Sequence, residues 1–408
     1  MTPAEYLDRH EPSLVALLQK LIRVSTVNPP GENYSLITAM LTAELRRLDL
    51  AVRRLPVPPR QQKEHLPVHP RYNVLGWWDA GAKKTVHFNA HYDVVPVSGK
   101  WRHGDAFTPA VERGWVYGRG SADMKGAIAS ILFALRALRE TGAKPRCNVE
   151  VSFTADEETD SRLGAGWLVK NAPLRADYAV VGEGGEAGHV CCGHNGVVWI
   201  EVHVHGRAAH GSTPEKGVNA LEKMSALVVA LEDYKRLLAK RTFRAPDGRM
   251  MRPTINVGGV FSAGPGGKIN TVPAAASFTI DRRVLAVESH AAAERELTGF
   301  VRKAAARIPD CRITVKKVSE NFSCYHEPKH PFFTAAQASV ARVRSKTAGF
   351  MVASGFNDMH FFAHHLKIPT LGYGPGGLDF HAVDERARVS DLVDSAKIYA
   401  DLLTTFNG

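Results

Sequence analysis

Residues 85–93 read TVHFNAHYD. Apolar side chains stand at every second position of 86–90, which is the period-two pattern of a β-strand. The run ends at His91 and Asp93, whose side chains can bind a metal or move a proton. We therefore expect a strand with chemically active side chains at its carboxyl end.

Two later segments repeat this arrangement. Residues 149–153 alternate toward Glu157 and Glu158, and residues 178–181 form an apolar run that reaches Glu183. Each segment predicts another strand that is followed by acidic side chains.

Helical segments are expected between these strands, at residues 126–139 and 164–170. Strands and helices in alternation are typical of a largely parallel sheet that is covered by helices on both faces. Ligands of such open sheets gather outside the carboxyl ends of the strands. The sequence therefore predicts an α/β catalytic domain with its site at this edge of the sheet.

The pattern changes from about residue 192. Residues 198–204 alternate like a half-buried strand of an antiparallel sheet. A helix, two strands, a helix and a strand follow, at 219–238, 254–261, 276–283, 290–306 and 312–318. This is the split βαβ, ferredoxin-like order of an α+β domain. We expect it to be inserted, giving catalytic segments at 1–191 and 320–408 around a second domain at 192–319.

The composition suits a globular enzyme of two domains. The chain has 408 residues, of which 44% are hydrophobic and 23% charged. A single hydrophobic core usually stops growing near about 250 to 300 residues, so one core is not enough. The five cysteines are odd in number and lack metal-finger spacing, so we expect buried thiols in a reducing compartment.

The formal net charge of +11 favours anionic partners. The largest basic cluster, at residues 235–252, is interrupted by apolar residues and carries no nucleic-acid signature, which favours a solvated helix end and loop. The amino terminus has the pattern of neither a signal peptide nor a membrane helix. We therefore expect a cytoplasmic protein that binds neither nucleic acid nor a membrane.

Oxygen and nitrogen ligands gather at the predicted strand ends, without a thiolate among them. Such a set suits a pair of Zn²⁺ or related divalent ions, which polarise a carbonyl and activate a water. Glu157 and Glu158 are adjacent, so one can bind metal while the other moves protons. Each residue alone also fits a helix cap, a turn or a surface histidine, but the joint pattern favours a metal site. The candidates are His91, Asp93, Asp123, Glu157, Glu158, Glu183 and His381.

With these motifs, the chain resembles the co-catalytic zinc exopeptidase family that includes acetylornithine deacetylase, succinyl-diaminopimelate desuccinylase, aminoacylase and glutamate carboxypeptidase. The resemblance runs from STVNPPGEN at 25–33 to HAVDERARVSDL at 381–392. It implies a homodimer in which the inserted domain is both lid and dimerisation domain. It also implies two divalent ions, with Zn²⁺ expected and Co²⁺ or Mn²⁺ as alternatives.

The resemblance further implies roles for the candidate residues. Asp123 would bridge the two ions, and Glu157 would be the general base. Asp93 would hold the His91 ring in its ligating orientation. The Asp123–Met124 peptide bond would be cis. The remaining ligands would be His91 and Glu183 for one ion, and Glu158 and His381 for the other.

The inserted domain carries residues that resemble substrate contacts. The motif AAHGSTPEKGVNA, at 208–220, is similar to the family's lid motif, and it implies that His210 reaches the neighbouring subunit's site and stabilises the oxyanion. Asn270 and Arg283 are similar to positions that contact a substrate carboxylate. Arg282 is the competing choice for this contact, and strand alternation should decide between the two arginines.

Three further features bear on the substrate. The loop that contains Gly374 and Gly376 resembles one whose backbone amides line the substrate pocket, although an ordinary turn is the alternative. The candidate ligand Glu183 is a glutamate rather than an aspartate, which favours the deacetylase and desuccinylase members. Asn357 stands where relatives usually carry Ser or Thr, so the substrate of no single relative is carried over.

We therefore predict a metal-dependent amidohydrolase that removes the acyl group from N-acyl amino acids, with Glu157 as general base to the activated water. Its substrate would carry a carboxylate. A dipeptidase or carboxypeptidase of the same family is the alternative. A non-catalytic binding protein, or a nucleic-acid binder, is the alternative from another class. The intact Glu157 argues against the first, and the lack of a basic stripe or aromatic platform against the second.

Overall fold

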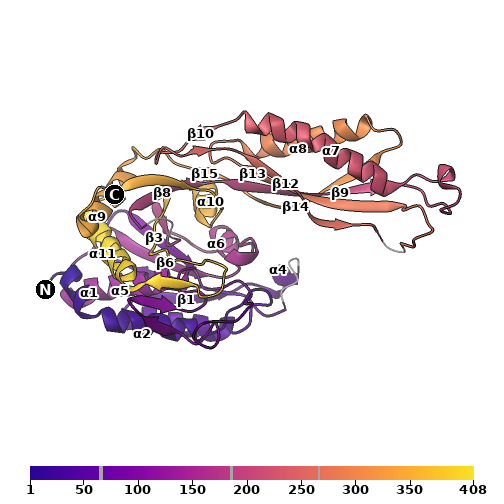
Figure 1. Cartoon of the computed structure of the whole chain (residues 1–408). Coiled ribbons are helices and arrows are strands. Elements are labelled where there is room, and N and C mark those ends of the chain that lie inside the picture. The colour runs from indigo at the N-terminus through magenta and orange to yellow at the C-terminus, as the bar shows by residue number, and fades with distance from the viewer. Residues whose placement is uncertain (64–67, 184–186, 265–266) are drawn as a thin grey trace. The chain divides into compact units, whose positions relative to one another are not determined.

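The structure, a computed structural model, describes residues 1–63, 68–183, 187–264 and 267–408 (Figure 1). It divides into two compact units. The first unit contains residues 1–193, 326–351 and 357–408, and the second contains residues 194–325 and 352–356. The boundaries expected from the sequence were 191/192 and 319/320.

The first unit is built on a mixed, mostly parallel sheet, and this confirms the expected α/β class. Strand β3 pairs in parallel with β6 on one side and β7 on the other, and β17 pairs in parallel with β7. Antiparallel strands extend both sides of this parallel centre. The strand order is β1 (Ala51–Pro56), β2 (Tyr72–Trp78), β6 (Asn148–Thr154), β3 (Thr85–His91), β7 (Tyr178–Val181), β17 (Thr370–Gly372) and β8 (His189–His194), with β16 (Gly349–Ala353) beside β8.

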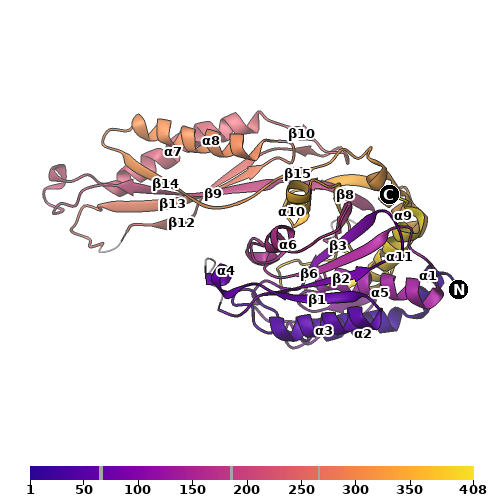
Figure 2. The same ribbon diagram turned by 180° about the vertical axis from the view of Figure 1, so that it is seen from behind.

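Helices cover both faces of this sheet. Figures 1 and 2 show α2, α3 and α5 on one face and α6 and α10 on the other. The helix bounds are α1 (Pro3–Arg9), α2 (Glu11–Ile22), α3 (Tyr34–Arg47), α4 (Pro59–Lys63), α5 (Lys125–Thr141), α6 (Ala165–Asn171), α9 (Pro331–Arg344), α10 (Met359–Phe361) and α11 (Val389–Thr405).

Strand β3 is buried on both faces, yet its sequence alternates. The apolar side chains at 86, 88 and 90 alternate with His87, Asn89 and His91, which therefore lie on the opposite face. A buried polar row needs hydrogen-bond partners. His87 donates from Nδ1 to Glu150 and accepts at Nε2 from the Ser152 hydroxyl, each over 2.8 Å. The polar side chains of β6 thus provide partners for the buried His87 ring.

Short elements complete the first unit. A small antiparallel sheet consists of β4 (Ala110–Glu112), β5 (Trp115–Tyr117) and β18 (Arg386–Arg388), with β5 in the middle. A 3₁₀ turn, η1 (Glu157–Thr159), follows β6, and a π-helical turn, η3 (Phe362–Leu366), follows α10.

The second unit is an antiparallel sheet with two helices on one face, in the expected order of elements. The sheet order is β12-β13-β9-β14, and α7 and α8 run along it (Figure 1). The exposure of β13 alternates strictly between buried and partly buried residues. The elements of the second unit are β9 (Gly196–His205), η2 (Pro214–Lys216), α7 (Ala220–Ala239), β10 (Phe243–Arg244), β11 (Met250–Met251), β12 (Thr254–Ser262), β13 (Ala275–Val284), α8 (His290–Ala306), β14 (Arg312–Asn321) and β15 (Cys324–Tyr325).

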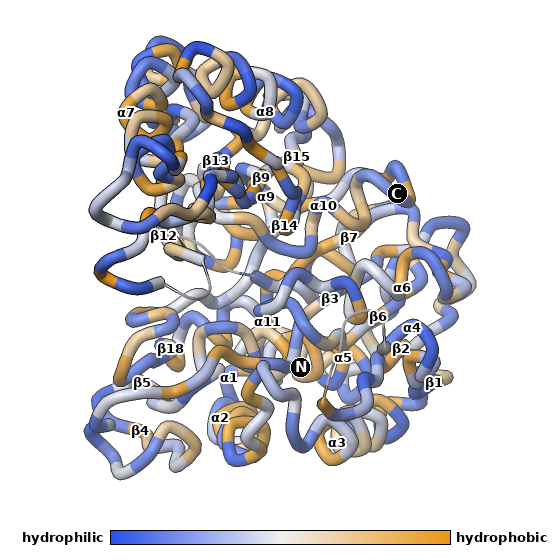
Figure 3. Tube along the Cα trace, turned by 90° about the vertical axis from the view of Figure 1, so that its right-hand side faces the viewer, coloured by the Kyte–Doolittle hydropathy of each residue, from blue (hydrophilic) through white to orange (hydrophobic). Residues whose placement is uncertain are grey.

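A hydrophobic core of its own holds the second unit together. Strand residues Ile200 and Phe278 pack in one cluster with the helix residues Leu231 and Leu297, all almost fully buried. Figure 3 shows hydrophobic and hydrophilic residues interspersed along α7 and α8, as expected for helices with one face on a sheet. Within the described ranges of the chain, no helix has the length and apolar character needed to cross a membrane.

His326 couples the stability of the first unit to pH. Its ring accepts a hydrogen bond at Nε2 from the Thr370 N–H over 3.4 Å and packs against Phe333. Burial, together with the nearby His330 and His364, lowers the pKa of His326 to about 4. The unfolded chain protonates this ring near its ordinary pKa of 6.5. Between these two values only the unfolded state binds the proton, so the free energy of unfolding decreases as pH falls.

We predict that His326→Gln weakens this pH dependence. Glutamine can still accept from Thr370 but does not titrate, so the variant should lose less stability than the wild type between pH 6.5 and 4.5. Urea unfolding at pH 7.5, 6.5, 5.5 and 4.5 measures the two slopes. Equal slopes for variant and wild type would contradict the assignment.

Candidate active site and metal centre

The candidate ligands lie at the carboxyl edge of the parallel strands. His91 ends β3, Glu157 and Glu158 begin the turn that follows β6, and Glu183 comes two residues after β7. Because β6, β3 and β7 are parallel neighbours, these ends meet at one edge. Asp123 joins them from the segment just before α5.

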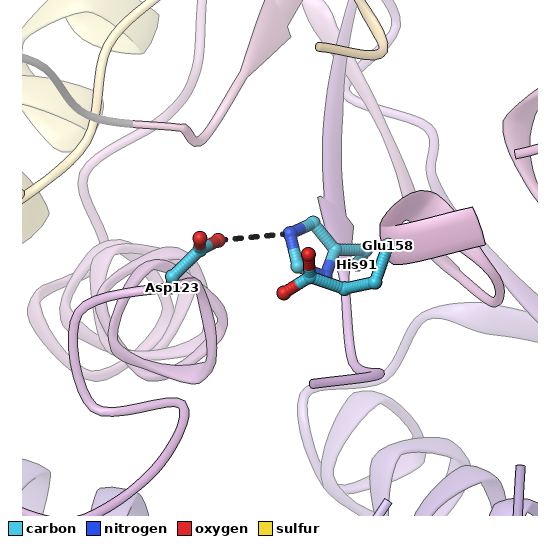
Figure 4. A group of neighbouring side chains, drawn as sticks. All are labelled: His91, Asp123 and Glu158. Carbon is cyan, nitrogen blue, oxygen red and sulfur yellow. Dashed lines mark hydrogen bonds and ion pairs between the residues drawn. The ribbon is translucent and has the colours of Figure 1, made fainter. Parts of the chain in front are cut away.

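Four side chains form a close cluster of ligand atoms. His91 Nε2 lies 3.1 Å from one carboxylate oxygen of Asp123, and His381 Nε2 lies 3.2 Å from the other. Glu158 is 3.3 Å from the same nitrogen of His381. One ligand atom each of His91, Asp123 and Glu158 lies within 4.8 Å of the other two. Figure 4 shows these three side chains pointing toward one another from three separate elements.

The hydrogen bonds of His91 determine which ring nitrogen is available to a metal. Its Nδ1 is 3.0 Å from the backbone carbonyl oxygen of Asp93, which can only accept, so Nδ1 carries the proton. Nε2, which faces Asp123, is therefore the nitrogen that a metal would take in place of a proton. The Asp93 residue does hold the ring, but its carbonyl is closer to Nδ1 than its carboxylate, which is 3.5 Å away.

The Asp93 carboxylate instead holds the turn with the two glutamates. It accepts hydrogen bonds from the backbone N–H groups of Glu157 at 3.1 Å and Glu158 at 3.2 Å. The Asn28 side chain donates to it as well, over 3.1 Å. Because the backbone makes these bonds, both glutamate side chains stay available for chemistry.

The two glutamates differ in their neighbours. Glu158 reaches His381, whereas the nearest histidine nitrogen to the Glu157 carboxylate is His91 Nε2, at 3.9 Å. Glu183 is partly buried, and its buried Oε2 atom has no hydrogen-bond partner among the described residues. A buried carboxylate oxygen without a donor is costly unless a cation binds there.

The site gathers several acidic groups close together, and their pKa values are shifted. Burial and the Glu183 carboxylate raise the pKa of Glu157 well above its ordinary value, and burial and Asp123 do the same for Glu183. Hydrogen bonds to Asp123 and Glu158 raise the pKa of His381 to about 10. Burial and mutual repulsion thus disfavour full ionisation of this acidic cluster.

The residues present fit a pair of divalent cations. The donors are imidazole nitrogen and carboxylate oxygen, which suit Zn²⁺ and related ions. Ligand atoms about 2.0 to 2.2 Å from a tetrahedral Zn²⁺ lie roughly 3.3 to 3.6 Å from one another. The nitrogen-to-oxygen distances of 3.1 to 3.3 Å around Asp123 are close to that spacing.

Asp123 lies in a tightly held segment. The Asp123–Met124 peptide bond is cis, as the resemblance implied. The backbone N–H of Asp123 donates to the fully buried carboxylate of Glu385 over 3.0 Å. The Lys125 ammonium donates to the carbonyl oxygens of Leu21 and Val24 at the end of α2.

Sequence reasoning missed three polar residues around the site. Asn28 belongs to the quoted motif at 25–33 and contacts Asp93, whereas Glu385 belongs to the motif at 381–392. Asp358 is buried, accepts from the Ser161 hydroxyl and raises the pKa of Glu157 and Glu183. A polar residue inside a motif was the available signal, but only contacts distinguish such residues from turn formers.

The glycine loop after β17 packs beside the Asp123 segment. Gly374 and Gly376 are buried, and Gly376 has a φ of +61°. A side chain at Gly377 would collide with Ala122 and with the Arg386 carbonyl. The glycines therefore permit a close approach that leads the chain to His381.

His210 and Asn270 are neighbours within the second unit. The Gly211 N–H donates to the Asn270 carbonyl over 2.7 Å, next to a bridge between His210 and Thr271. The exposed His210 ring accepts at Nδ1 from the Ser212 N–H over 3.2 Å. An N–H can only donate, so the neutral ring carries its proton on Nε2. The ring thus presents a donor to its surroundings.

The two arginines of β13 point to opposite faces of the sheet. Arg282 is fully buried, and its guanidinium lies 3.1 Å from Glu288. Arg283 is on the partly exposed face, where it pairs with Asp281 at 2.9 Å. Strand alternation thus leaves Arg283 as the arginine that a ligand can reach.

A mostly parallel α/β sheet with a cluster of carboxylates and imidazoles at its carboxyl edge suits a metal-dependent hydrolase. Residues 87–405 match the peptidase family M20/M25/M40, and the chain belongs to this family. It is 26% identical to acetylornithine deacetylase of Proteus mirabilis over 402 residues, which cover 97% of each chain. It is 27% identical to succinyl-diaminopimelate desuccinylase of a Bradyrhizobium species over 333 residues, 79% of this chain and 83% of the relative.

Solved structures share the fold over nearly the whole chain. A tripeptidase from Staphylococcus aureus matches with a TM-score of 0.76 at 19% identity, covering 97% of this chain and 98% of its own. A dinuclear metal-binding peptidase of family M20 from Bacillus subtilis matches with a TM-score of 0.68 at 14% identity, with the same coverage. The protein is an enzyme, a metal-dependent hydrolase that acts on amide bonds.

We predict that a divalent cation stabilises the folded protein through Asp123. Excess Zn²⁺ should raise the melting temperature of chelator-treated wild type by about 5 °C or more, because the assembled ligands exist only in the folded state. Asp123→Asn should lose most of this increase, since it removes the carboxylate that contacts both histidines. Differential scanning fluorimetry with and without Zn²⁺ measures both proteins.

Asp177→Asn is the matched control for this experiment. Asp177 is also a hydrogen-bonded carboxylate of the first unit, but it accepts from the Thr85 N–H at the start of β3, at the other end of that strand. Its variant should keep the full response to Zn²⁺. A wild-type response in Asp123→Asn would contradict the assignment.

Proposed function

We propose that this hydrolase removes the acyl group from N-acyl amino acids. Two named relatives support the proposal, because acetylornithine deacetylase and succinyl-diaminopimelate desuccinylase match over most of the chain. The observation that carries it is the pair of adjacent glutamates whose backbone is fixed by Asp93, one of them within the ligand cluster. This arrangement supplies a metal ligand and a free carboxylate side by side.

The residues that would hold two divalent ions follow from the cluster. Asp123 would bridge them, because its two oxygens face two different histidines. His91 and Glu183 would complete one site, and Glu158 and His381 the other. Zn²⁺ is the expected ion, with Co²⁺ or Mn²⁺ as alternatives. When bound, such ions polarise the substrate carbonyl and lower the pKa of a nearby water.

Glu157 would carry the proton. Its carboxylate takes a proton from the attacking water and then delivers it to the nitrogen of the leaving amine, so the same group serves first as base and then as acid. Burial supports this role, because it raises the pKa of Glu157 toward the range in which proton exchange is effective. Asp93 keeps the backbone of Glu157 in place during both transfers.

The second unit would complete the site in a homodimer. His210, with its proton on Nε2, would donate to the oxyanion of the neighbouring subunit's substrate. Arg283 would clamp the substrate carboxylate, with Asn270 and the amides of the Gly374 and Gly376 loop as further contacts. The edge strand β12 supports dimerisation, because it leaves Val260 and Phe261 more than half exposed.

We also propose a cytoplasmic protein that binds neither nucleic acid nor a membrane. Free cysteines support a reducing compartment, since Cys147, Cys191, Cys192 and Cys324 are buried thiols. Much of the basic cluster at 235–252 is paired with acidic neighbours, as in the ion pairs of Arg241 with Glu288 and Glu296. Its remaining charge is therefore a weak nucleic-acid surface.

Glu157→Gln should lower kcat by at least about 100-fold, because the isosteric amide cannot accept the proton. Its metal content should equal that of the wild type. The measurement is hydrolysis of N-acetyl, N-succinyl and N-formyl amino acids with added Zn²⁺, Co²⁺ or Mn²⁺, together with elemental analysis of the protein. The control is Glu150→Gln. Glu150 is a buried carboxylate of β6, the strand that precedes Glu157, and this variant should keep its activity.

Undiminished turnover in Glu157→Gln would sink the mechanism. The same assay with dipeptides distinguishes the deacylase from the alternative, a peptidase. Structural neighbours that are peptidases favour this second candidate, a dipeptidase or carboxypeptidase. Hydrolysis of dipeptides without any deacylation would establish it in place of the deacylase, and hydrolysis of neither would refute both candidates.

Mixing two inactive variants tests the role of His210 across the dimer. His210→Ala and Glu157→Gln should each have low activity. In a mixed dimer, one site would combine the intact Glu157 of one subunit with the intact His210 of the other. Random subunit exchange should therefore restore about a quarter of wild-type activity, since half of the dimers are mixed and each has one complete site. No recovery in a mixture that light scattering and tagged pull-down show to be mixed dimers would contradict the proposal.

A further inference from the structure

We propose that Glu385 is a positioning residue that sets the spacing between the metal ligands Asp123 and His381. The inference rests on the proposed two-metal site and goes beyond it, because it assigns a role to a residue that binds neither metal nor substrate. Glu385 lies four residues after His381 and is fully buried. It thereby connects two ligands that are 258 residues apart in the sequence.

The Glu385 carboxylate accepts from the whole segment that presents Asp123. One oxygen accepts from the N–H groups of Ala122 at 2.9 Å and Asp123 at 3.0 Å. The other accepts from the N–H of Gly120 at 3.0 Å and from Nη1 of Arg119 at 2.6 Å. Four donors on one carboxylate fix the position of this segment relative to the Glu385 backbone.

The backbone around Glu385 is fixed to the same segment. The Gly118 N–H donates to the Glu385 carbonyl over 3.0 Å, and Arg119 Nη2 donates to the Ala382 carbonyl over 3.2 Å. Residue 386 begins β18, which pairs with β5 directly before Gly118. The loop that carries His381 and the segment that carries Asp123 are therefore attached at several points, with the buried carboxylate at the centre.

The His381 loop needs such an attachment. His381 has a φ of +61°, and Asp379 and Asp384 have φ values of +59° and +62°. Three non-glycine residues in the left-handed region are an unfavourable local conformation that the surroundings must maintain. His381 itself is exposed, so packing alone does not hold it.

Only a carboxylate suits this position. It offers two oxygens that accept and no group that donates, and it matches the charge of Arg119, which is itself buried. Glutamine would turn its NH₂ group toward backbone N–H groups and lose half of the acceptors. The expected consequence is a shift of the Asp123 segment away from His381. The ion at Glu158 and His381 should suffer more than the ion at His91 and Glu183, because the latter ligands are anchored on β3 and behind β7.

The test is the affinity of each metal ion in Glu385→Gln. Chelator-treated protein is titrated with Zn²⁺ against a chromophoric chelator, and hydrolysis is measured over a range of Zn²⁺ concentrations. We expect the first ion to bind within about threefold of wild type and the second at least about tenfold more weakly, as for other residues that orient ligands. Excess Zn²⁺ should restore most of kcat, which loss of a catalytic group would not allow.

Glu150→Gln is the matched control. Glu150 is a buried carboxylate that accepts from the Arg175 N–H and from His87, away from the ligand loops. Its variant should bind both ions like the wild type even where its melting temperature falls. Equal weakening in Glu150→Gln and Glu385→Gln would overturn the proposal in favour of general loosening, and wild-type affinities in Glu385→Gln would overturn it directly.

A second variant covers the case in which Glu385→Gln does not fold, and the wild type separates failure of this proposal from failure of the proposed function. If Glu385→Gln does not fold, Glu385→Asp keeps the charge on a shorter side chain and should weaken the second ion to a smaller degree, whereas unchanged binding would overturn the proposal. A wild type that binds two ions but hydrolyses no amide refutes the proposed function alone. A wild type that binds fewer than two ions refutes the role of Glu385 whatever its activity.

Discussion

The parallel pairing of β3 with β6 and β7 is the constraint on which the site depends. Three adjacent strands that run in the same direction must end at one edge, and each end here carries or is followed by a candidate metal ligand. An antiparallel neighbour would have carried its acidic residues to the other end of the sheet. The buried imidazole of His87 in β3 finds its partners on β6, in Glu150 and Ser152.

Crowding of like charges follows directly from that geometry. Burial and mutual repulsion raise the pKa values of Glu157 and Glu183 well above the ordinary value. A bound divalent ion would oppose both effects, so this arrangement of carboxylates and imidazoles favours cation binding.

Two carboxylates that bind no metal keep this arrangement in place. Asp93 fixes the turn of Glu157 and Glu158 through their backbone, and Glu385 fixes the segment of Asp123 in the same manner. Both accept mainly from backbone N–H groups, so the side chains of the candidate ligands stay free to bind metal. Supporting residues of this kind are as important to a metal site as the ligands themselves.

Much of this protein could be predicted from residue order alone. Period-two alternation toward His91 and Glu157, and an apolar run toward Glu183, indicated the strands, their carboxyl-end chemistry and the α/β class, because such patterns depend only on neighbours in the chain. The choice of Arg283 over Arg282 as the exposed arginine required the observed face of β13. The roles of Asp93 and Glu385 could not be read from the sequence, because a carboxylate that accepts backbone N–H groups from a distant segment has no local pattern. Only the tertiary structure decides such contacts, since it alone determines which segments meet.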